Sequence, residues 1–257
     1  PYTIIEHEVD GKAIDIGVIG FVPPQIMEWD NLHLEGDVEV RDIVESAERY
    51  LPELEEQSDI VVALAHTGIS EDDDDTENAG VPLAEVDGID ALLLGHNHNT
   101  FPGHSSYEEI EGVDGENGTI HDVPAVMAGD WGSHLGTIEL NLTEDNGEWS
   151  IEDAASDVTS VEGAEENDEI VELTEDVHER TLDHINEEVG SVTADVNTFF
   201  SRVMDNEVLQ LVNDAQMWFA EDYFSDTEYE GKPLLSAAAP FRANGDYTEV
   251  DEGEVTI

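Results

Sequence analysis

Three histidines follow short apolar runs of the sequence, where a sheet would deliver ligands to a site. His66 comes directly after residues 59–65, and His96 and His98 come after residues 89–94. Open α/β sheets place their sites at the carboxyl ends of strands. Because His96 and His98 are two positions apart, an extended chain would put both imidazoles on one face, ~6.5–7 Å apart at Cα. We therefore predict a metal site here, with one ion or with two ions ~3.5–4 Å apart.

The ligand type narrows the choice of metal. Imidazole nitrogen is a ligand for Zn, Mn, Fe or Co rather than for Mg or Ca. Neutral imidazoles leave two divalent ions without anionic ligands, so carboxylates are also needed. Asp130 and Asp37, each after a glycine, are candidates by composition only, and for both a surface turn is the simpler interpretation. His134 is a candidate for lining the same site, with a packed loop histidine as the alternative.

A further candidate contact lies near the end of the chain. Residues 236–242 are small and apolar around a single cation, in a chain with only seven Lys and Arg. Arg242 beside Phe241 is therefore a candidate for contacting an anion and an aromatic ring of a substrate. A surface arginine in a salt bridge is the alternative.

The charge of the chain is extreme. Its 257 residues include 65 Asp and Glu against seven Lys and Arg, a formal net charge of -58. Nucleic acids and anionic membrane surfaces are poor partners for this charge. Hydrophobic residues make up 39%, too many for a disordered acidic tail. At molar salt the Debye length falls to ~3 Å, which screens the repulsion, so we predict adaptation to concentrated salt.

Several classes of protein are excluded or disfavoured by absent motifs. A Ca²⁺-binding acidic protein is the alternative to salt adaptation, but no Asp-x-Asp-x-Asp-Gly loop is present. The chain has no cysteine and no Gly-x-Ser-x-Gly motif, which removes the usual cysteine and serine nucleophiles. It also has no Gly-rich phosphate loop or dinucleotide fingerprint.

Apolar periodicity predicts an α/β fold for the first part of the chain. The pattern of strand, helix and strand indicates βαβ units in a largely buried sheet. The predicted elements are a hairpin around Asp10-Gly11 with arms at 3–9 and 12–22, a helix over 41–57 that Pro52 should kink or end early, buried strands at 59–65, 89–94 and 123–127, a weak helix at 81–86, and a half-exposed strand at 135–142.

The composition changes at about Thr143, where the chain becomes acidic and poor in large apolar residues. Beyond this point we expect helices over 169–188 and 204–224 and a short strand at 234–235. The expected divisions are a domain at 1–145, an acidic linker with a linker helix at 146–190, and a further domain at 191–257.

Segments in order along nearly the whole chain carry a family resemblance. They are Gly-Phe-Val-Pro-Pro-Gln-Ile-Met-x-Trp-Asp at 20–30, the stretch 31–36, Ala-His-x-Gly-Ile-Ser at 65–70, Gly-His-x-His at 95–98, Phe-Pro-Gly at 101–103, Pro-Ala-Val-Met at 124–127, Trp-Gly-x-His-Leu-Gly at 131–136 and Leu-Ser-Ala-Ala-Ala-Pro-Phe at 235–241. They resemble the bifunctional 2',3'-cyclic-nucleotide 2'-phosphodiesterase/3'-nucleotidases, of the 5'-nucleotidase-like metallophosphoesterase family. Gly-His-x-His marks only the superfamily, whereas Pro-Pro-Gln-Ile-Met and Ser-Ala-Ala-Ala-Pro-Phe mark the subfamily.

The resemblance implies the second half of a metallophosphoesterase sandwich, a buried mixed sheet with helices. A linker helix and the start of a C-terminal α/β domain, which holds the nucleoside around Arg242 and Phe241, would follow. His66 and His96 would bind one of two divalent ions (Mn, Zn or Co) and His98 the other. The two ions would polarise the phosphate and activate a water to hydrolyse 2',3'-cyclic nucleotides and 3'-nucleotides.

The chain departs from the family pattern in one respect. The family's Asp-x-His, Gly-Asp and Gly-Asn-His-Glu segments supply the bridging Asp, an Asn ligand and the transition-state His, and that ordered set is missing here. We therefore expect an internal fragment that hydrolyses little by itself, with no catalytic residue identifiable in it.

Two other functions and two locations stay open. The alternative functions are a 5'-nucleotidase or sugar-nucleotide hydrolase, and a non-catalytic nucleoside-binding module. The resemblance implies export in a high-salt organism, with the signal peptide outside this chain, while a cytoplasm rich in KCl would suit the same acidic surface.

Overall fold

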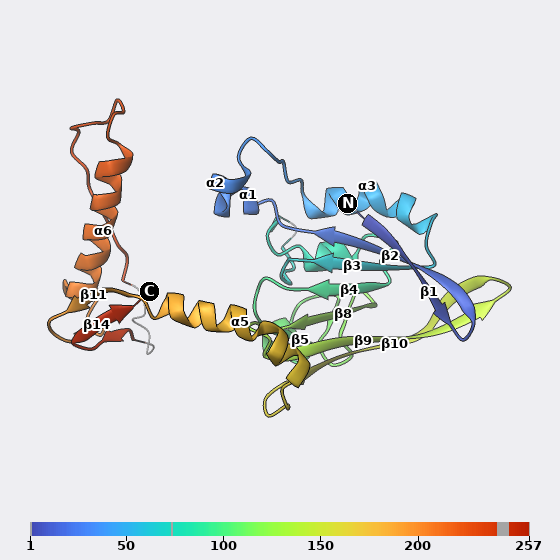
Figure 1. The fold of residues 1–257 in the computed structure, drawn as a ribbon. Coiled ribbons are helices and arrows are strands. Elements are labelled where there is room, and N and C mark those ends of the chain that lie inside the picture. The colour runs from blue at the N-terminus through green and yellow to red at the C-terminus, as the bar shows by residue number, and fades with distance from the viewer. Residues whose placement is uncertain (1, 73, 241–246, 257) are drawn as a thin grey trace. The chain divides into compact units, whose positions relative to one another are not determined.

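The computed structural model describes residues 2–72, 74–240 and 247–256. The chain divides into two compact units, Pro1–Ala164 and Glu165–Ile257 (Figure 1). None of the helices in the described part combines the length and the apolar character needed to cross a lipid bilayer.

The first unit is built on one mixed sheet. Among the described residues eight strands form it, in the order β1-β2-β3-β4-β8-β7-β6, with β5 paired to β8. The strands are β1 (Tyr2–Val9), β2 (Lys12–Phe21), β3 (Ile60–Ala65), β4 (Ala91–Leu94), β5 (Thr100–Phe101), β6 (Val113–Asp114), β7 (Thr119–Ile120) and β8 (Val123–Ala128). Strands β2, β3, β4 and β8 run parallel, so their carboxyl ends meet at one edge. The predicted hairpin and βαβ arrangement are confirmed.

Short helices join these strands, and one longer helix covers the sheet. They are α1 (Ile26–Trp29), α2 (Asn31–Leu34), α3 (Ile43–Glu55), α4 (Gly80–Ala84) and the 3-10 helix η1 (Ser105–Tyr107). The Asp42 side chain caps α3 by accepting a hydrogen bond from the backbone N–H of Glu45. The expectation that Pro52 ends this helix early is wrong, because the helix continues to Glu55. Leu51 and Leu54, both fully buried, hold its last turns against the core.

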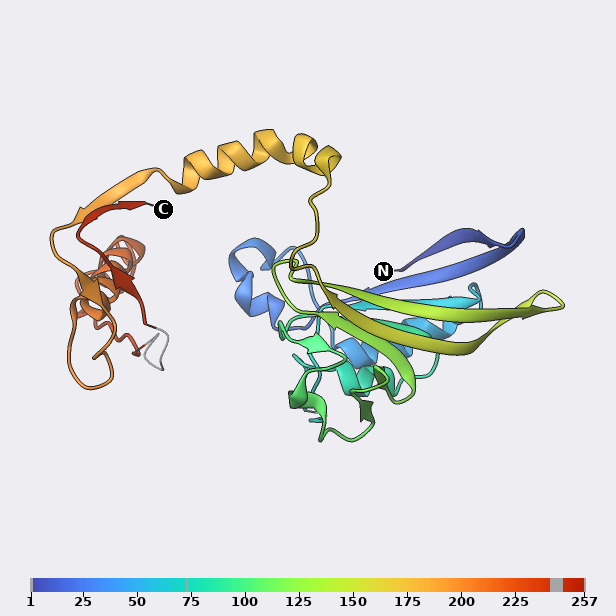
Figure 2. The ribbon, with the colours of Figure 1, turned by 90° about the horizontal axis from the view of Figure 1, so that it is seen from below.

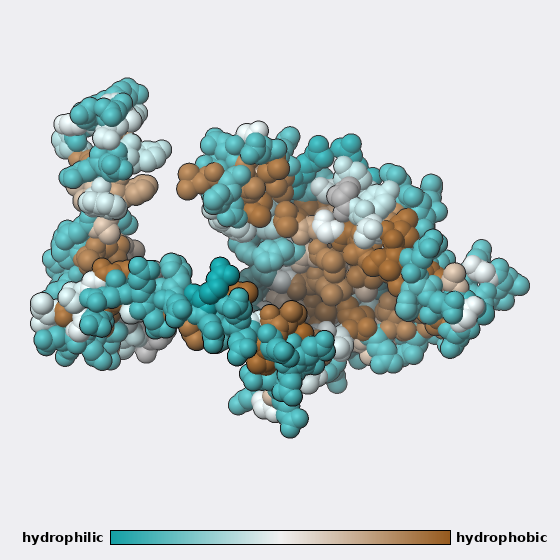
Figure 3. Space-filling model, viewed as in Figure 1, coloured by the Kyte–Doolittle hydropathy of each residue, from teal (hydrophilic) through white to brown (hydrophobic). Residues whose placement is uncertain are grey.

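The two faces of the sheet are covered unequally. On the face that packs against α3 and α4, Ala63 and Leu92 are fully buried. Their neighbours Leu64 and Leu93 point to the opposite face, where they are 45% and 38% exposed. Figure 3 shows apolar side chains gathered in a hollow of this unit, over the sheet strands labelled in Figure 1. This face therefore carries apolar surface that is only partly covered within the unit.

A long hairpin covers the rest of that face. It consists of β9 (His134–Asp145) and β10 (Glu148–Ser160), and Figure 2 shows it lying across the sheet toward the β1–β2 hairpin. Gly136 lets β9 approach closely, since a Cβ atom there would lie 2.6 Å from Val126 Cγ2 on β8. At the far end the Trp149 indole donates a hydrogen bond to the Ala13 carbonyl, 3.0 Å away.

The hairpin corrects the expectation of an acidic linker from residue 146. Residues 148–160 instead form β10, paired with β9 along its length. Half-buried Trp149, Ile151 and Val158 alternate with exposed residues, many of them acidic, on the other side of the strand. Few large apolar residues are needed to cover one face, so the composition concealed the strand.

In its described residues the second unit contains two helices and two small sheets. Its elements are α5 (Asp168–Ile185), β11 (Glu188–Val192), β12 (Val196–Asn197), α6 (Glu207–Tyr223), β13 (Glu249–Val250) and β14 (Gly253–Thr256), with β11 paired to β14 and β12 to β13. Both predicted helices are confirmed, but the strand at 234–235 is wrong. That segment runs along α6 instead, where the Ser236 hydroxyl lies 2.8 Å from Asn213 Oδ1.

Leu92 and Leu93 offer a direct test of the unequal faces. Leu92→Ala should lower the free energy of unfolding by ~2–5 kcal/mol, because it leaves a cavity in a closed core. Leu93→Ala should lower it by only about 1 kcal/mol, because Leu93 is 38% exposed. Urea unfolding followed by circular dichroism measures both values. Equal losses would contradict the open face described above.

The charge of the chain predicts a strong dependence of stability on salt. Within the described residues the only ion pair between an acid and Lys or Arg is Lys12–Glu144, so most acids lack a cationic partner. We expect the free energy of unfolding to rise between ~0.1 M and ~1 M KCl, as the Debye length falls from ~10 to ~3 Å. Urea unfolding at each salt concentration measures this, with sucrose of equal osmolarity as the uncharged control. A free energy of unfolding that is equal at both KCl concentrations would refute the prediction.

Candidate metal centre

The parallel strands bring two of the predicted histidines into contact. His66 directly follows β3, and His96 lies in the loop after β4, the parallel neighbour of β3. The two ring centroids are 5.3 Å apart, with the rings at an angle of 64°. Residues 30 positions apart in the sequence therefore share one edge of the sheet, as the motif positions predicted.

The loop that carries His96 and His98 is not extended, so the expectation that they lie as in a strand is wrong. His96 has φ 70° and His98 has φ 60°, both in the left-handed region. This region is uncommon for residues other than glycine, and such strain persists only where the surroundings hold the backbone in place. Strand β4 ends at Leu94, and the chain turns immediately afterwards.

One of the two aspartate candidates lies near a histidine. Asp130 follows β8, the next strand of the sheet, and its Oδ2 is 4.0 Å from His98 Nδ1. Both side chains are substantially exposed. Asp37 lies in an exposed turn after α2, where its backbone N–H donates to the Leu34 carbonyl. The structure places Asp37 in the surface turn that was the simpler interpretation.

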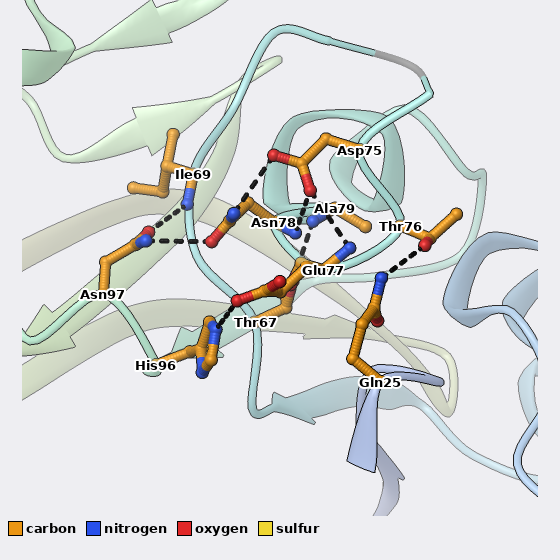
Figure 4. A network of polar contacts seen from close by, with 10 residues as sticks. All are labelled: Gln25, Thr67, Ile69, Asp75, Thr76, Glu77, Asn78, Ala79, His96 and Asn97. Atoms are coloured by element: carbon orange, nitrogen blue, oxygen red, sulfur yellow. Dashed lines mark hydrogen bonds and ion pairs between the residues drawn. The ribbon is translucent and has the colours of Figure 1, made fainter. Parts of the chain in front are cut away.

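Two further side chains contact His96 and were not predicted. Its Nε2 is 2.7 Å from Glu77 Oε1 (Figure 4). The Trp29 indole stacks on the imidazole, with centroids 5.3 Å apart and planes at 19°. Glu77 follows the acidic loop before α4 and was indistinguishable from its acidic neighbours in sequence. Trp29 belongs to a motif of the family resemblance, but its spacing carried no sign of this contact.

The environment of His66 favours its neutral form. Burial lowers the pKa of His66 below its usual value of 6.5, and positive charge on His96 and His98 would lower it further. Neutral imidazole has a free nitrogen lone pair, which is the form that binds metal ions. The chemistry of these donors therefore fits a transition-series ion.

His134 was also a candidate for lining this site. His134 begins β9, and its Nδ1 is 2.9 Å from the hydroxyl of its neighbour Ser133. Phe241 and Arg242 lie outside the described residues. Within the described ranges no group of three or more His, Asp and Glu side chains is close enough to hold a metal ion. The imidazoles thus fit as part of a ligand set that these residues do not complete.

Comparison with known proteins relates the whole chain to one group of enzymes. No protein-family model matches it. It is 40% identical over 266 residues to the trifunctional nucleotide phosphoesterase protein YfkN of Bacillus subtilis, covering 99% of this chain and 18% of that protein. It is 38% identical over 279 residues to the 2',3'-cyclic-nucleotide 2'-phosphodiesterase/3'-nucleotidase of Haemophilus influenzae, covering 100% of this chain and 42% of that enzyme.

The fold agrees with the sequence comparison. The crystal structure of the calcineurin-like phosphoesterase YfkN from Bacillus subtilis superposes with a TM-score of 0.68 at 38% identity. The match covers 73% of this chain and 59% of the crystallised chain. The chain spans less than half the length of both curated relatives. Nearly the whole chain is therefore related to part of the 2',3'-cyclic-nucleotide 2'-phosphodiesterase/3'-nucleotidases. It has part of a calcineurin-like phosphoesterase fold.

Proposed function

We propose that this chain is the histidine-bearing part of a metal-dependent phosphoesterase that hydrolyses 2',3'-cyclic nucleotides and 3'-nucleotides. The contact of His66 with His96 at the ends of adjacent parallel strands carries the proposal. The 38% identity to an enzyme named for this activity supports the choice of substrate.

In this proposal the three histidines divide between two ions. His66 and His96 bind one divalent ion and His98 the other, with Mn, Zn or Co as the metals that imidazole favours. Two such ions supply polarisation of the phosphate and activation of a water for attack at phosphorus. The neutral state of His66 keeps its lone pair available for a ligand bond. Asp130 Oδ2 lies 4.0 Å from His98 Nδ1 and adds a carboxylate beside that exposed ring.

We propose that the remaining metal ligands lie in a segment that corresponds to the part of the relatives outside the match with this chain. Three neutral imidazoles cannot balance the charge of two divalent ions, and within the described residues no larger cluster of ligands exists. By itself the chain should therefore bind metal weakly and hydrolyse little. Bound cations would also make the local potential positive, which lets an anionic nucleotide approach an acidic surface.

The proposal extends to the rest of the chain and to its surroundings. Phe241 and Arg242 are proposed to contact the nucleotide, and residues 191–257 to begin the domain that holds it. The assignment of residues 1–145 to a catalytic half-domain remains a prediction, as does a linker role for helix α5 (Asp168–Ile185). The acidic surface is proposed to serve an exported enzyme in concentrated salt.

Two proteins test the proposed activity: the chain by itself, and a hybrid enzyme that supplies the segments the chain lacks. The 257-residue chain in molar KCl should hydrolyse 2',3'-cyclic AMP slowly or not at all with Mn²⁺ or Co²⁺. A hybrid in which it replaces the matching segment of the Haemophilus influenzae enzyme should hydrolyse 2',3'-cyclic AMP and 3'-AMP. His98→Ala in the hybrid should reduce the rate by more than roughly 100-fold, because a metal ligand is lost. Phosphate and nucleoside release measure these rates.

Other outcomes would favour other functions. His178→Ala, on helix α5, is the matched histidine control and should leave the rate unchanged. Rapid hydrolysis by the chain alone would overturn its proposed incompleteness. Preference of the hybrid for 5'-AMP over 3'-AMP would favour a 5'-nucleotidase. A hybrid that is folded by circular dichroism and binds nucleoside despite chelator, without hydrolysis, would favour a binding module.

The burial of His66 predicts how its imidazole titrates. Burial lowers the pKa of His66 below 6.5, with added lowering from His96 and His98. The unfolded state binds the imidazole proton of His66 more tightly than the folded state does. The contribution of His66 to the free energy of unfolding is therefore complete above pH 6.5 and decreases as the pH falls through the folded-state pKa. NMR titration of the imidazole carbons should show this low pKa, and His98→Asn should raise it toward 6.5. A His66 pKa above 6.5 would contradict the prediction.

A further inference from the structure

We propose that Glu77 is a positioning residue that orients His96 by accepting a hydrogen bond from its Nε2. The inference rests on the proposed metal-binding function, because it concerns which nitrogen of His96 is left for a ligand bond. Neither the family motifs nor the histidine spacing pointed to Glu77. Carboxylates that accept from the second nitrogen of a ligating histidine are a general means of fixing its tautomer and ring orientation.

The contact with Glu77 defines which nitrogen of the His96 ring carries a proton. Glu77 Oε1 lies 2.7 Å from His96 Nε2, and an ionised carboxylate only accepts. Nε2 must therefore carry a proton, and in the neutral imidazole this leaves the lone pair on Nδ1. Trp29 stacks on the same ring at 19°, and its plane limits rotation of the imidazole. The imidazole is 18% exposed and the Glu77 side chain 39%, so the donor is largely shielded from water while the acceptor is partly open to it.

The main chain of Glu77 is held on both sides. Its backbone N–H donates to Asp75 Oδ1 at 3.1 Å. Its carbonyl accepts from the Thr67 hydroxyl at 2.7 Å, and the same hydroxyl oxygen accepts from the Ala79 N–H at 2.7 Å. Thr67 is fully buried and directly follows His66. The carboxylate therefore projects toward His96 from a backbone that is anchored to the neighbouring histidine segment.

A chain of side-chain amides joins the two loops. Asn97, between the two loop histidines, accepts from the Ile69 N–H at 2.9 Å and donates to Asn78 Oδ1 at 2.8 Å. Asn78 in turn donates to Asp75 Oδ2 at 3.0 Å. Figure 4 shows these residues converging between the loops after β3 and β4. The loop that carries His96 is thus fastened to the loop that carries Glu77.

Gly68 shows how closely the two loops fit. A Cβ atom at Gly68 would lie 1.6 Å from Asn97 Oδ1, so any side chain there would displace the amide. The same amide follows His96 directly, and His96 and His98 are both in the left-handed region. The hydrogen bond that Asn97 accepts from Ile69 and the one that it donates to Asn78 are suited to hold this strained loop in place. The geometry points to a preformed orientation of His96 rather than a chance surface pair.

The test compares three variants of the full chain in molar KCl. Glu77→Ala removes the acceptor, and Glu77→Gln keeps an amide oxygen that can accept from Nε2. Glu85→Ala is the matched control. It removes another carboxylate paired with a histidine, since Glu85 Oε1 lies 3.2 Å from His121 Nε2. Long-range ¹H–¹⁵N NMR of the metal-free protein reports the His96 tautomer, and Co²⁺ titration followed by visible absorption reports metal affinity.

We expect His96 to be protonated at Nε2 in the wild type and in Glu85→Ala. Glu77→Ala should give a mixture of tautomers and weaken Co²⁺ binding by about 10- to 100-fold. Glu77→Gln should keep the tautomer and lose less affinity. A loss of packing alone would not convert the tautomer selectively, and Glu77→Gln keeps the test decisive if Glu77→Ala fails to fold.

Two results separate this inference from the proposed function. If His96→Ala binds Co²⁺ as tightly as the wild type, the proposed metal site itself is wrong. If His96→Ala loses affinity while Glu77→Ala keeps both the tautomer and the affinity of the wild type, the metal site stands and Glu77 has no positioning role. An Nδ1-protonated His96 in the wild type would also overturn the inference.

Discussion

The parallel alignment of β2, β3, β4 and β8 is the constraint on which the rest of the first unit depends. Parallel strands end together, so every segment that leaves a carboxyl end starts from the same edge of the sheet. His66, His96 and Asp130 each reach this edge from a different strand. The pairing of strands therefore brings separate sequence motifs to one edge of the sheet, which no local segment could do.

The loops beyond that edge are held by polar side chains in addition to the buried Ile69 and Ala79. Thr67 satisfies backbone groups of Glu77 and Ala79 farther along its own loop. Asn97 accepts from the Ile69 N–H of the other loop and donates to the Asn78 side chain. Such bonds are directional, so they fix side-chain orientation as well as position. This explains how the left-handed backbone at His96 and His98 can persist at the end of a short strand. It also couples the histidines to Glu77, which the sheet alone would leave free.

The two faces of the sheet differ in how fully they are covered. One face is closed by α3 and α4 over a continuous core. The other is covered by the β9–β10 hairpin at one end and exposes Leu64 and Leu93 at the other. The acids lie mostly on the surface, where their repulsion depends on the salt concentration. A protein of this kind keeps an ordinary core while its surface responds to its ionic surroundings.

The sequence by itself determined the elements whose signal is local. The hairpin at Asp10-Gly11, the buried strands around His66 and His96 and both later helices follow from turn chemistry and apolar periodicity, and the structure confirms them. Strand β10 was missed because small residues and alternating acids hide a half-covered strand. Only the tertiary structure decided that Glu77 and Trp29 meet His96 and that the His96–His98 loop is left-handed. Those contacts join residues distant in sequence, and no periodicity encodes a distance between loops.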